Sequence, residues 1–356
     1  MDRKIAQVIT FLWIVSSFIA CKKENNDNQP PPTNTGKKVF VVCEGSMGNG
    51  NSSLLLYKSD TDSIYEAVYR TVNHHPLGDV FQSMIRIGDQ YFLCINNSDK
   101  ILAIDATTFE LNGIIHIPKP RFILPVNNQK AYVSSLFNNT LFTIDPSTLQ
   151  ITATIELPFQ NPEGLLFWND KVVICCWDTA CSSVLLMDPT TNAITSTIAI
   201  TGSAPQEAVV DKEGNLWVVA GNRSKGKPCT LLQIGATQQI LNSFSFSPEI
   251  DLMKPVLNIT KDTLYFITAN LMGGTQYSGI FRTSIYATQL PDQPFISAQP
   301  YQYFWALGME PMTGNIWIGD PKGFIQKGSV QVYQSNGEKI REFQTGVGPG
   351  RFYFDY

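Results

Sequence analysis

Histidine, the side chain most often used for proton transfer near neutral pH and for metal ligation, is scarce in this chain. The 356 residues include 3 histidines. The chain also lacks a Gly-x-Ser-x-Gly nucleophile elbow, a phosphate-binding loop and any cysteine or histidine spacing typical of zinc sites. These absences weigh against hydrolases, nucleotide-binding proteins and metal-dependent lyases. We therefore predict that the protein is not an enzyme and holds no metal or cofactor.

Charge of either sign is also scarce. Charged residues make up 16% of the chain and hydrophobic residues 43%, with a net charge of −4. The basic runs do not extend beyond the pairs Lys22–Lys23 and Lys37–Lys38. Proteins that bind nucleic acid concentrate Lys and Arg on one face, so we expect no nucleic-acid partner. The 25 glycines and 21 prolines are typical of a globular all-β protein.

The first 20 residues have the pattern of an export signal. A charged start is followed by an apolar stretch that ends at Ala20 and is too short to span a bilayer. The four residues that end at Cys21 resemble a bacterial lipobox, in which the cysteine becomes the lipidated first residue. We predict a signal peptide over 1–20, then the lipidated Cys21 and a polar, disordered tether over 21–37. An ordinary signal peptide with an incidental cysteine is the alternative.

A strand-length pattern returns about every 40 residues, the size of one four-stranded propeller blade. Several copies end in Asp-x-x-Thr, a turn in which the Asp side chain caps its own backbone, as at Asp105 and Asp188. Seven copies of the second strand align without gaps: 39–43, 90–94, 130–134, 171–175, 215–219, 263–267 and 315–319. We therefore predict an all-β, seven-bladed β-propeller with four-stranded blades, forming a single domain over 38–356.

The two ends of the repeat array are complementary. The first repeat lacks its first strand, because the tether leads directly into Val39, and the chain ends with a spare strand from Arg351 to Phe354. We predict that this C-terminal strand completes blade one and closes the ring, which removes an exposed sheet edge. The alternative is that the last residues form an outer strand of blade seven.

The cysteines after Cys21 follow the repeat. Cys43, Cys94 and Cys175 occupy one column, in which other copies carry Ser, Val, Ile or Gly, so we interpret them as small buried packing residues. An exported protein can form disulfides, and Cys176 with Cys181 could close a short loop.

Amide, arginine and aromatic side chains gather at one predicted rim. In a propeller, the first residues of the innermost strands and the loops after the second strands share one face around the channel. Such groups suit a flat, polar-edged small molecule. The alternative is a hydrated rim whose aromatics pack within the blades. The candidate ligand-binding residues are Gln82, Asn97, Arg121, Phe137, Asn138, Glu163, Trp177, Asp178, Gln206, Asn222, Arg223, Tyr277, Trp305, Asp320 and Arg351.

Several segments resemble a known group of propellers. They are 44–46, 78–84, 95–98, 120–121, 131–133 and 346–350. The chain resembles the YncE-like propeller lipoproteins of the Bacteroides lineage, specifically the BtuG type. This resemblance implies a lipid-anchored outer-membrane protein that captures vitamin B12 at the cell surface. It also implies a partner, a TonB-dependent transporter of the BtuB type.

The combined hypothesis is a monomeric, non-catalytic binding protein for a corrinoid such as cobalamin, attached to the membrane only by its lipid. Trp177 and Phe137 would contact the ring, Arg121 would meet propionamide or phosphate oxygens, and His74 or His75 could reach the cobalt. Two alternatives remain open. A surface scaffold for a protein or glycan partner would have a filled, flat channel mouth. A propeller lyase would need carboxylates that converge on a metal.

Overall fold

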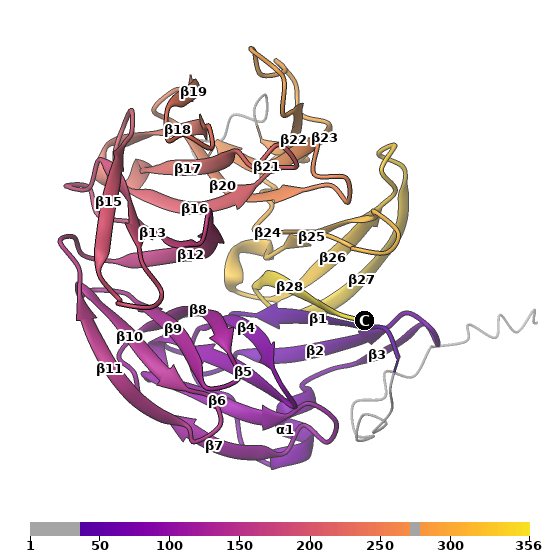
Figure 1. Cartoon of the computed structure of the whole chain (residues 1–356). Helices are drawn as coiled ribbons and strands as arrows, with labels where there is room; N and C mark the ends of the chain where they lie inside the picture. The colour runs from indigo at the N-terminus through magenta and orange to yellow at the C-terminus, as the bar shows by residue number, and fades with distance from the viewer. Residues whose placement is uncertain (1–35, 271–277) are drawn as a thin grey trace, which may run out of the picture.

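The computed structural model describes residues 36–270 and 278–356, which form seven four-stranded antiparallel sheets arranged in a ring (Figure 1). The predicted all-β, seven-bladed propeller is therefore confirmed. The expected signal peptide, Cys21 and the candidate Tyr277 lie outside the described residues. Within the described ranges, the helices are α1 (Val68–Asn73) and the 3-10 turns η1 (Asn96–Ser98), η2 (Arg223–Lys225) and η3 (Lys322–Phe324). None of these helices is long and apolar enough to cross a bilayer.

In every blade the strands are hydrogen bonded in the order in which they lie from the channel outward. Blades one to four are β28 (Pro349–Asp355), β1 (Lys38–Cys43), β2 (Ser53–Lys58), β3 (Ser63–Tyr65); β4 (Phe81–Ile87), β5 (Gln90–Ile95), β6 (Lys100–Asp105), β7 (Leu111–Ile115); β8 (Pro120–Asn127), β9 (Lys130–Ser135), β10 (Thr140–Asp145), β11 (Gln150–Glu156); and β12 (Pro162–Trp168), β13 (Lys171–Cys176), β14 (Ser183–Met187), β15 (Ile194–Ala199). Blades five to seven are β16 (Pro205–Val210), β17 (Leu216–Asn222), β18 (Lys227–Ile234), β19 (Ile240–Ser245); β20 (Ile250–Leu257), β21 (Thr263–Asn270), β22 (Gly279–Ser284), β23 (Ile296–Ser297); and β24 (Ala306–Met309), β25 (Ile316–Asp320), β26 (Lys327–Tyr333), β27 (Lys339–Val347).

The C-terminal strand closes the ring, as predicted. β28 pairs antiparallel with β1, where Phe352 lies opposite Val41, and these two strands lie side by side in Figure 1. The innermost strands contact one another in an unbroken circle in which β28 touches both β4 and β24. The alternative is wrong, because β27 already occupies the outer edge of blade seven. Pairing of β28 also covers the β1 edge that would otherwise be open to other chains.

The second strands are hydrophobic at almost every position because both of their faces are buried. In β1, Phe40 and Val42 pack into the apolar cluster shared with blade two, whereas Val39 and Val41 pack into the cluster shared with blade seven. Successive strand residues point to opposite faces, so one strand serves two cores. This double burial explains why the second strands gave the clearest repeat in the sequence.

The outer hairpins are closed by the predicted aspartate turns. Oδ1 of Asp105 accepts the backbone N–H groups of Thr107 and Thr108 at 2.8 and 2.7 Å. Phe109 then adopts a positive φ of 64°, and the ladder between β6 and β7 shifts register. A turn followed by one left-handed residue is a common hairpin connection. Hydrogen bonds to the carboxylate, led by the one from Thr108, lower the pKa of Asp105.

The six cysteines of the described ranges are buried and unpaired. Cys43, Cys94 and Cys175 have no exposed surface, as expected for packing residues. Cys176 and Cys181 form no disulfide, and the Cys181 thiol donates a hydrogen bond to the Ser183 carbonyl at 3.1 Å.

Candidate ligand-binding site at the channel mouth

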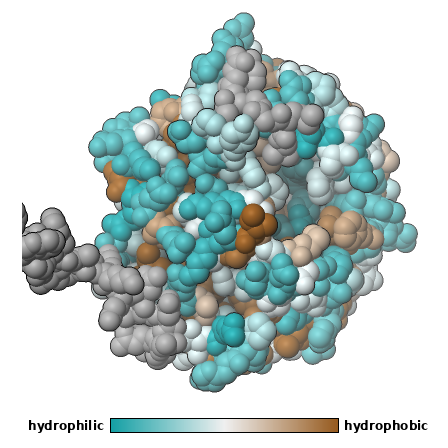
Figure 2. All heavy atoms as spheres, turned by 180° about the vertical axis from the view of Figure 1, so that it is seen from behind, coloured by the Kyte–Doolittle hydropathy of each residue, from teal (hydrophilic) through white to brown (hydrophobic). Residues whose placement is uncertain are grey.

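A cavity of about 430 Å³ lies where the central channel opens, between the starts of the innermost strands and the loops after the second strands. This volume is within the range of small-molecule sites. Figure 2 shows one face of the ring, which is mostly polar, is hollowed near its centre and carries apolar side chains beside the hollow. The mouth is thus open and concave instead of filled and flat.

Irregularities in the innermost strands place side chains in this cavity. Register shifts occur at or beside Gln82 in β4, Arg121 in β8, Glu163 in β12, Gln206 in β16 and Lys254 in β20. A bulge leaves a residue outside the ladder and turns its side chain away from the alternation of the strand. All five side chains line the cavity. Repeated bulges therefore form a ring of polar groups around the channel.

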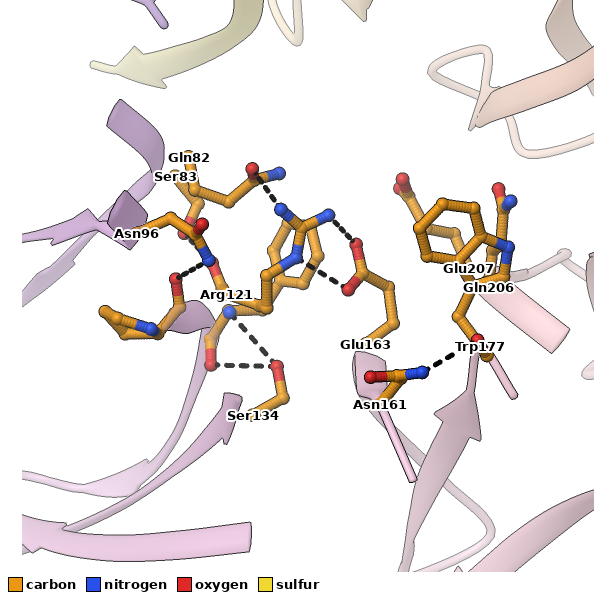
Figure 3. A network of polar contacts seen from close by, with 12 residues as sticks. Gln82, Ser83, Asn96, Arg121, Ser134, Asn161, Glu163, Trp177, Gln206 and Glu207 are labelled. Atoms are coloured by element: carbon orange, nitrogen blue, oxygen red, sulfur yellow. Dashed lines mark hydrogen bonds and ion pairs between the residues drawn. The ribbon is translucent and has the colours of Figure 1, made fainter. Parts of the chain in front are cut away.

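Arg121 is held in place from two neighbouring blades (Figure 3). Its Nε donates to Oε2 of Glu163 at 2.7 Å, its Nη2 donates to Oε1 of Glu163, and its Nη1 donates to Oε1 of Gln82. The side chains of Arg121 and Glu163 are 14% and 6% exposed. Burial opposes the charge of Arg121, but the nearby carboxylates, Glu163 first, raise its pKa. The guanidinium is therefore a fixed, charged group.

A second charged group lies on the other side of the channel. Arg351 Nη2 donates to Oε1 of Glu207 at 2.6 Å, and Lys254 Nζ lies 4.0 Å from the same oxygen. Trp305 Nε1 donates to Oε1 of Glu44 at 2.8 Å. Burial lowers the pKa of Lys254 to about 8. Burial opposes ionisation of Glu207, but Arg351 and Lys254 together lower its pKa. Around the channel, acidic and basic groups balance one another.

Aromatic side chains form part of the wall. Trp177 lines the cavity, and its Nε1 donates to the carbonyl of Gly221 at 2.9 Å, which fixes the indole. Gln206 donates to the same carbonyl at 3.2 Å. Phe137 also lines the cavity but is 74% exposed. A fixed indole and an exposed phenyl ring at one mouth can cover an apolar face of a ligand.

Ten of the predicted binding residues share this cavity: Gln82, Asn97, Arg121, Phe137, Glu163, Trp177, Gln206, Asn222, Arg223 and Trp305. Arg351 lies deeper, beside a second cavity of about 260 Å³ further along the channel. Three others serve local structure. Asn138 donates to Ser135 Oγ at 2.6 Å, Asp178 accepts the backbone N–H groups of Gln160 and Ala180, and Asp320 accepts from Gln302 at 2.7 Å. A role in binding stays a prediction for all of them.

Neither histidine proposed to reach a cobalt ion lines the cavity. The ring of His75 lies instead 3.2 Å from the hydroxyl of Tyr69. The carboxylates Glu44, Glu163 and Glu207 do share the cavity. Across 36–270 and 278–356, however, no three His, Cys, Asp or Glu side chains are grouped closely enough to hold a metal ion.

Sequence analysis did not select Lys254, although it lines the cavity. The candidate residues at the starts of the innermost strands included a member from every blade except blade six. A search for the missing member of that column would have pointed to the segment that forms β20. Strand alternation in the sequence does not indicate that Lys254 faces the cavity, because its orientation depends on a bulge and on a positive φ of 55°.

The fold and the site define a seven-bladed β-propeller with a preformed cavity at its channel mouth. The chain belongs to the DUF5074 family, described as a domain of unknown function, whose profile matches residues 37–354. No protein of curated function matches the chain.

Three solved structures show the same fold. A quinonprotein alcohol dehydrogenase-like protein from Bacteroides thetaiotaomicron aligns with a TM-score of 0.67 and 16% identity, over 90% of this chain and 78% of that chain. Hydrazine synthase from Kuenenia stuttgartiensis aligns with a TM-score of 0.57 and 13% identity, over 74% of this chain and 86% of that chain. The dihydro-heme d1 dehydrogenase NirN, in complex with DHE, aligns with a TM-score of 0.58 and 10% identity, over 91% and 76%. At sequence identities this low, the three comparisons establish a similar fold and say nothing about function.

Proposed function

We propose that this propeller is a non-catalytic binding protein of the BtuG type that captures a corrinoid at the cell surface. The main support for the proposal is the open cavity at the channel mouth. Its polar side chains are fixed by hydrogen bonds to one another, as between Arg121 and Glu163, and the Trp177 indole beside them is fixed by its bond to Gly221. Preplaced donors and walls lose little conformational entropy when a ligand binds, which favours affinity.

The charges of the cavity favour a ligand of low net charge. Arg121 is paired with Glu163, and Arg351 with Glu207, so these groups need no counter-charge from a ligand. A corrinoid fits this requirement, because amide groups dominate its edge. It is larger than the cavity, so part of it would remain outside. The exposed side chains of Met47 and Phe137, at the edge of the cavity, would contact that part.

The location and the partner are also proposals. The lipobox-like segment favours an outer-membrane lipoprotein anchored through Cys21, with the propeller as a monomer on the cell surface. Such a protein would pass its ligand to a TonB-dependent transporter of the BtuB type. Labelling of intact cells, together with mass spectrometry of the N-terminal peptide, tests the lipid and the outward orientation.

Calorimetry of the isolated propeller with cyanocobalamin tests the ligand. We expect binding, and we expect Trp177→Ala to weaken it about tenfold, which corresponds to about 1.4 kcal/mol. Tyr301→Ala is the matched control, because this aromatic residue is 96% exposed and does not line the cavity. No heat and no thermal shift with wild-type protein at micromolar concentration would overturn corrinoid capture.

A scaffold that binds a protein partner is the second candidate. It is favoured by the exposure of Met47, Phe137 and Ile325, which are 78%, 74% and 87% exposed. All three follow second strands and so belong to the same face of the ring. Photo-crosslinking from position 47 in cells grown without corrinoids would then capture a protein, and absence of a crosslink would count against this candidate.

A further inference from the structure

The charged groups around the mouth cavity differ in how well they are paired. Each of the three guanidinium nitrogens of Arg121 donates to Glu163 or Gln82, and Arg351 donates to Glu207 at 2.6 Å. Lys254 lies 4.0 Å from the oxygen that Arg351 already occupies. Its Nζ makes no hydrogen bond to any residue of 36–270 or 278–356. The Lys254 ammonium is therefore less well paired than the guanidinium groups of Arg121 and Arg351.

Lys254 is nevertheless built into the cavity. It lies at the bulge of β20 with a φ of 55°, its side chain is 9% exposed, and Nζ is 5.9 Å from the centre of the Trp305 ring. The register shift and the left-handed backbone turn this side chain out of the alternation of the strand. Burial of an ammonium group is unfavourable when no carboxylate accepts a hydrogen bond from it, and Glu207, the carboxylate in its ion pair, lies 4.0 Å away. A ligand anion at this position would relieve that cost.

A second cation of the same cavity also has an unused donor. Arg223, in η2 of the neighbouring blade five, lines the cavity, and its Nε is buried without a hydrogen-bond partner. Asp251 also lines the cavity and interacts electrostatically with Arg223, but burial raises the pKa of the Asp251 carboxyl, which weakens it as a counter-ion. Arg223 and Lys254 thus present unsatisfied donors from adjacent blades.

We infer that Lys254 and Arg223 form an oxyanion subsite within the mouth cavity that takes one phosphodiester group of the ligand. Charge-assisted hydrogen bonds from lysine and arginine are the usual way to hold such a group. The inference deepens the proposed function and rests on it, since a cobalamin carries one phosphodiester in its nucleotide loop. It also separates this subsite from Arg121, whose three guanidinium nitrogens each donate to Glu163 or Gln82.

The test compares two corrinoids, cyanocobalamin and dicyanocobinamide, of which the second lacks the phosphodiester. We expect Lys254→Met to weaken cyanocobalamin at least tenfold in calorimetry and to change dicyanocobinamide less than about twofold. Lys322→Met is the control, because Lys322 is an exposed cation on the same face that does not line the cavity. Equal effects on both ligands, or no effect, would overturn the subsite.

The pH dependence gives a readout that a purely structural lysine would not produce. The groups that act on Lys254 are Glu207 of β16, Glu44 after β1, Arg351 of β28 and Arg121 of β8. Burial lowers the pKa of Lys254 to about 8, and a bound anion would raise it again. Affinity for cyanocobalamin should therefore fall between about pH 7 and about pH 9. Lys254→Arg should keep the affinity and abolish this pH dependence, and an unchanged profile in that variant contradicts the inference.

The two proposals fail in different ways. If wild-type protein binds neither corrinoid, corrinoid capture is wrong, and the subsite is then tested with dimethyl phosphate and acetate in thermal-shift titrations. Stabilisation by dimethyl phosphate that is lost in Lys254→Met supports a phosphate-type subsite. Stabilisation by acetate alone, or by neither probe, overturns it.

Discussion

Replacement of Glu163 by glutamine should destabilise the propeller through Arg121. The carboxylate accepts two hydrogen bonds from the guanidinium, and both side chains are largely buried at 14% and 6% exposure. Removal of one partner of a buried ion pair costs about 3 to 5 kcal/mol. Glutamine keeps one accepting oxygen, and Glu44 and Glu207 also stabilise the arginine charge. We therefore expect Glu163→Gln to lower the free energy of unfolding by about 2 kcal/mol.

Urea unfolding followed by far-UV circular dichroism and tryptophan fluorescence measures this loss. Glu342→Gln is the matched control, because its ion pair with Lys339 is 43% and 47% exposed and should contribute less than about 0.5 kcal/mol. Adding Arg121→Met to Glu163→Gln should cost less than the two single changes together, because the unpaired buried charge is gone. Equal losses for Glu163→Gln and Glu342→Gln would refute the claim that burial makes the Arg121 pair important.

Further predictions concern closure, turns and core. Truncation before Pro349 removes β28 and opens the edge of β1. We expect the truncated protein to lose its cooperative melting transition and to self-associate in size-exclusion chromatography. A monomer that melts like the full chain would contradict the closed ring. A hydrogen bond from Lys171, followed by backbone N–H groups, lowers the pKa of Asp188 from 3.8 to about 2. The wild type should therefore be more stable than Asp188→Asn above about pH 4, and this advantage should disappear as the pH falls through about 2, as thermal melts can check. Trp217 is fully buried and its Nε1 donates to Asp211 at 2.9 Å. Trp217→Phe should therefore lower the free energy of unfolding in urea by about 1 to 3 kcal/mol. A variant as stable as wild type would show that this hydrogen bond contributes nothing.

The rim was predicted in part because each blade contributes equivalent positions to it. Gln82, Arg121 and Glu163 were found in the sequence as successive members of one column, and the structure brings them to one cavity. Asn138 and Asp320 occupy comparable loop positions, yet their side chains turn to local partners. The local loop conformation decides whether such a side chain bonds to nearby residues or points into the cavity. The repeat pattern in the sequence does not contain that information.

The sequence by itself determined the number of blades, the second strands, the aspartate turns and the closure by the C-terminal strand. These features depend on alternation, burial and short turns, which act within one repeat and therefore recur in its residues. Only the tertiary structure decided which charges meet. Arg351 reaches Glu207 across the ring, and Lys254 enters the cavity through a bulge. Such pairings depend on how seven blades curve into a circle and on local breaks in strand register, and neither of these produces a periodic signal along the chain.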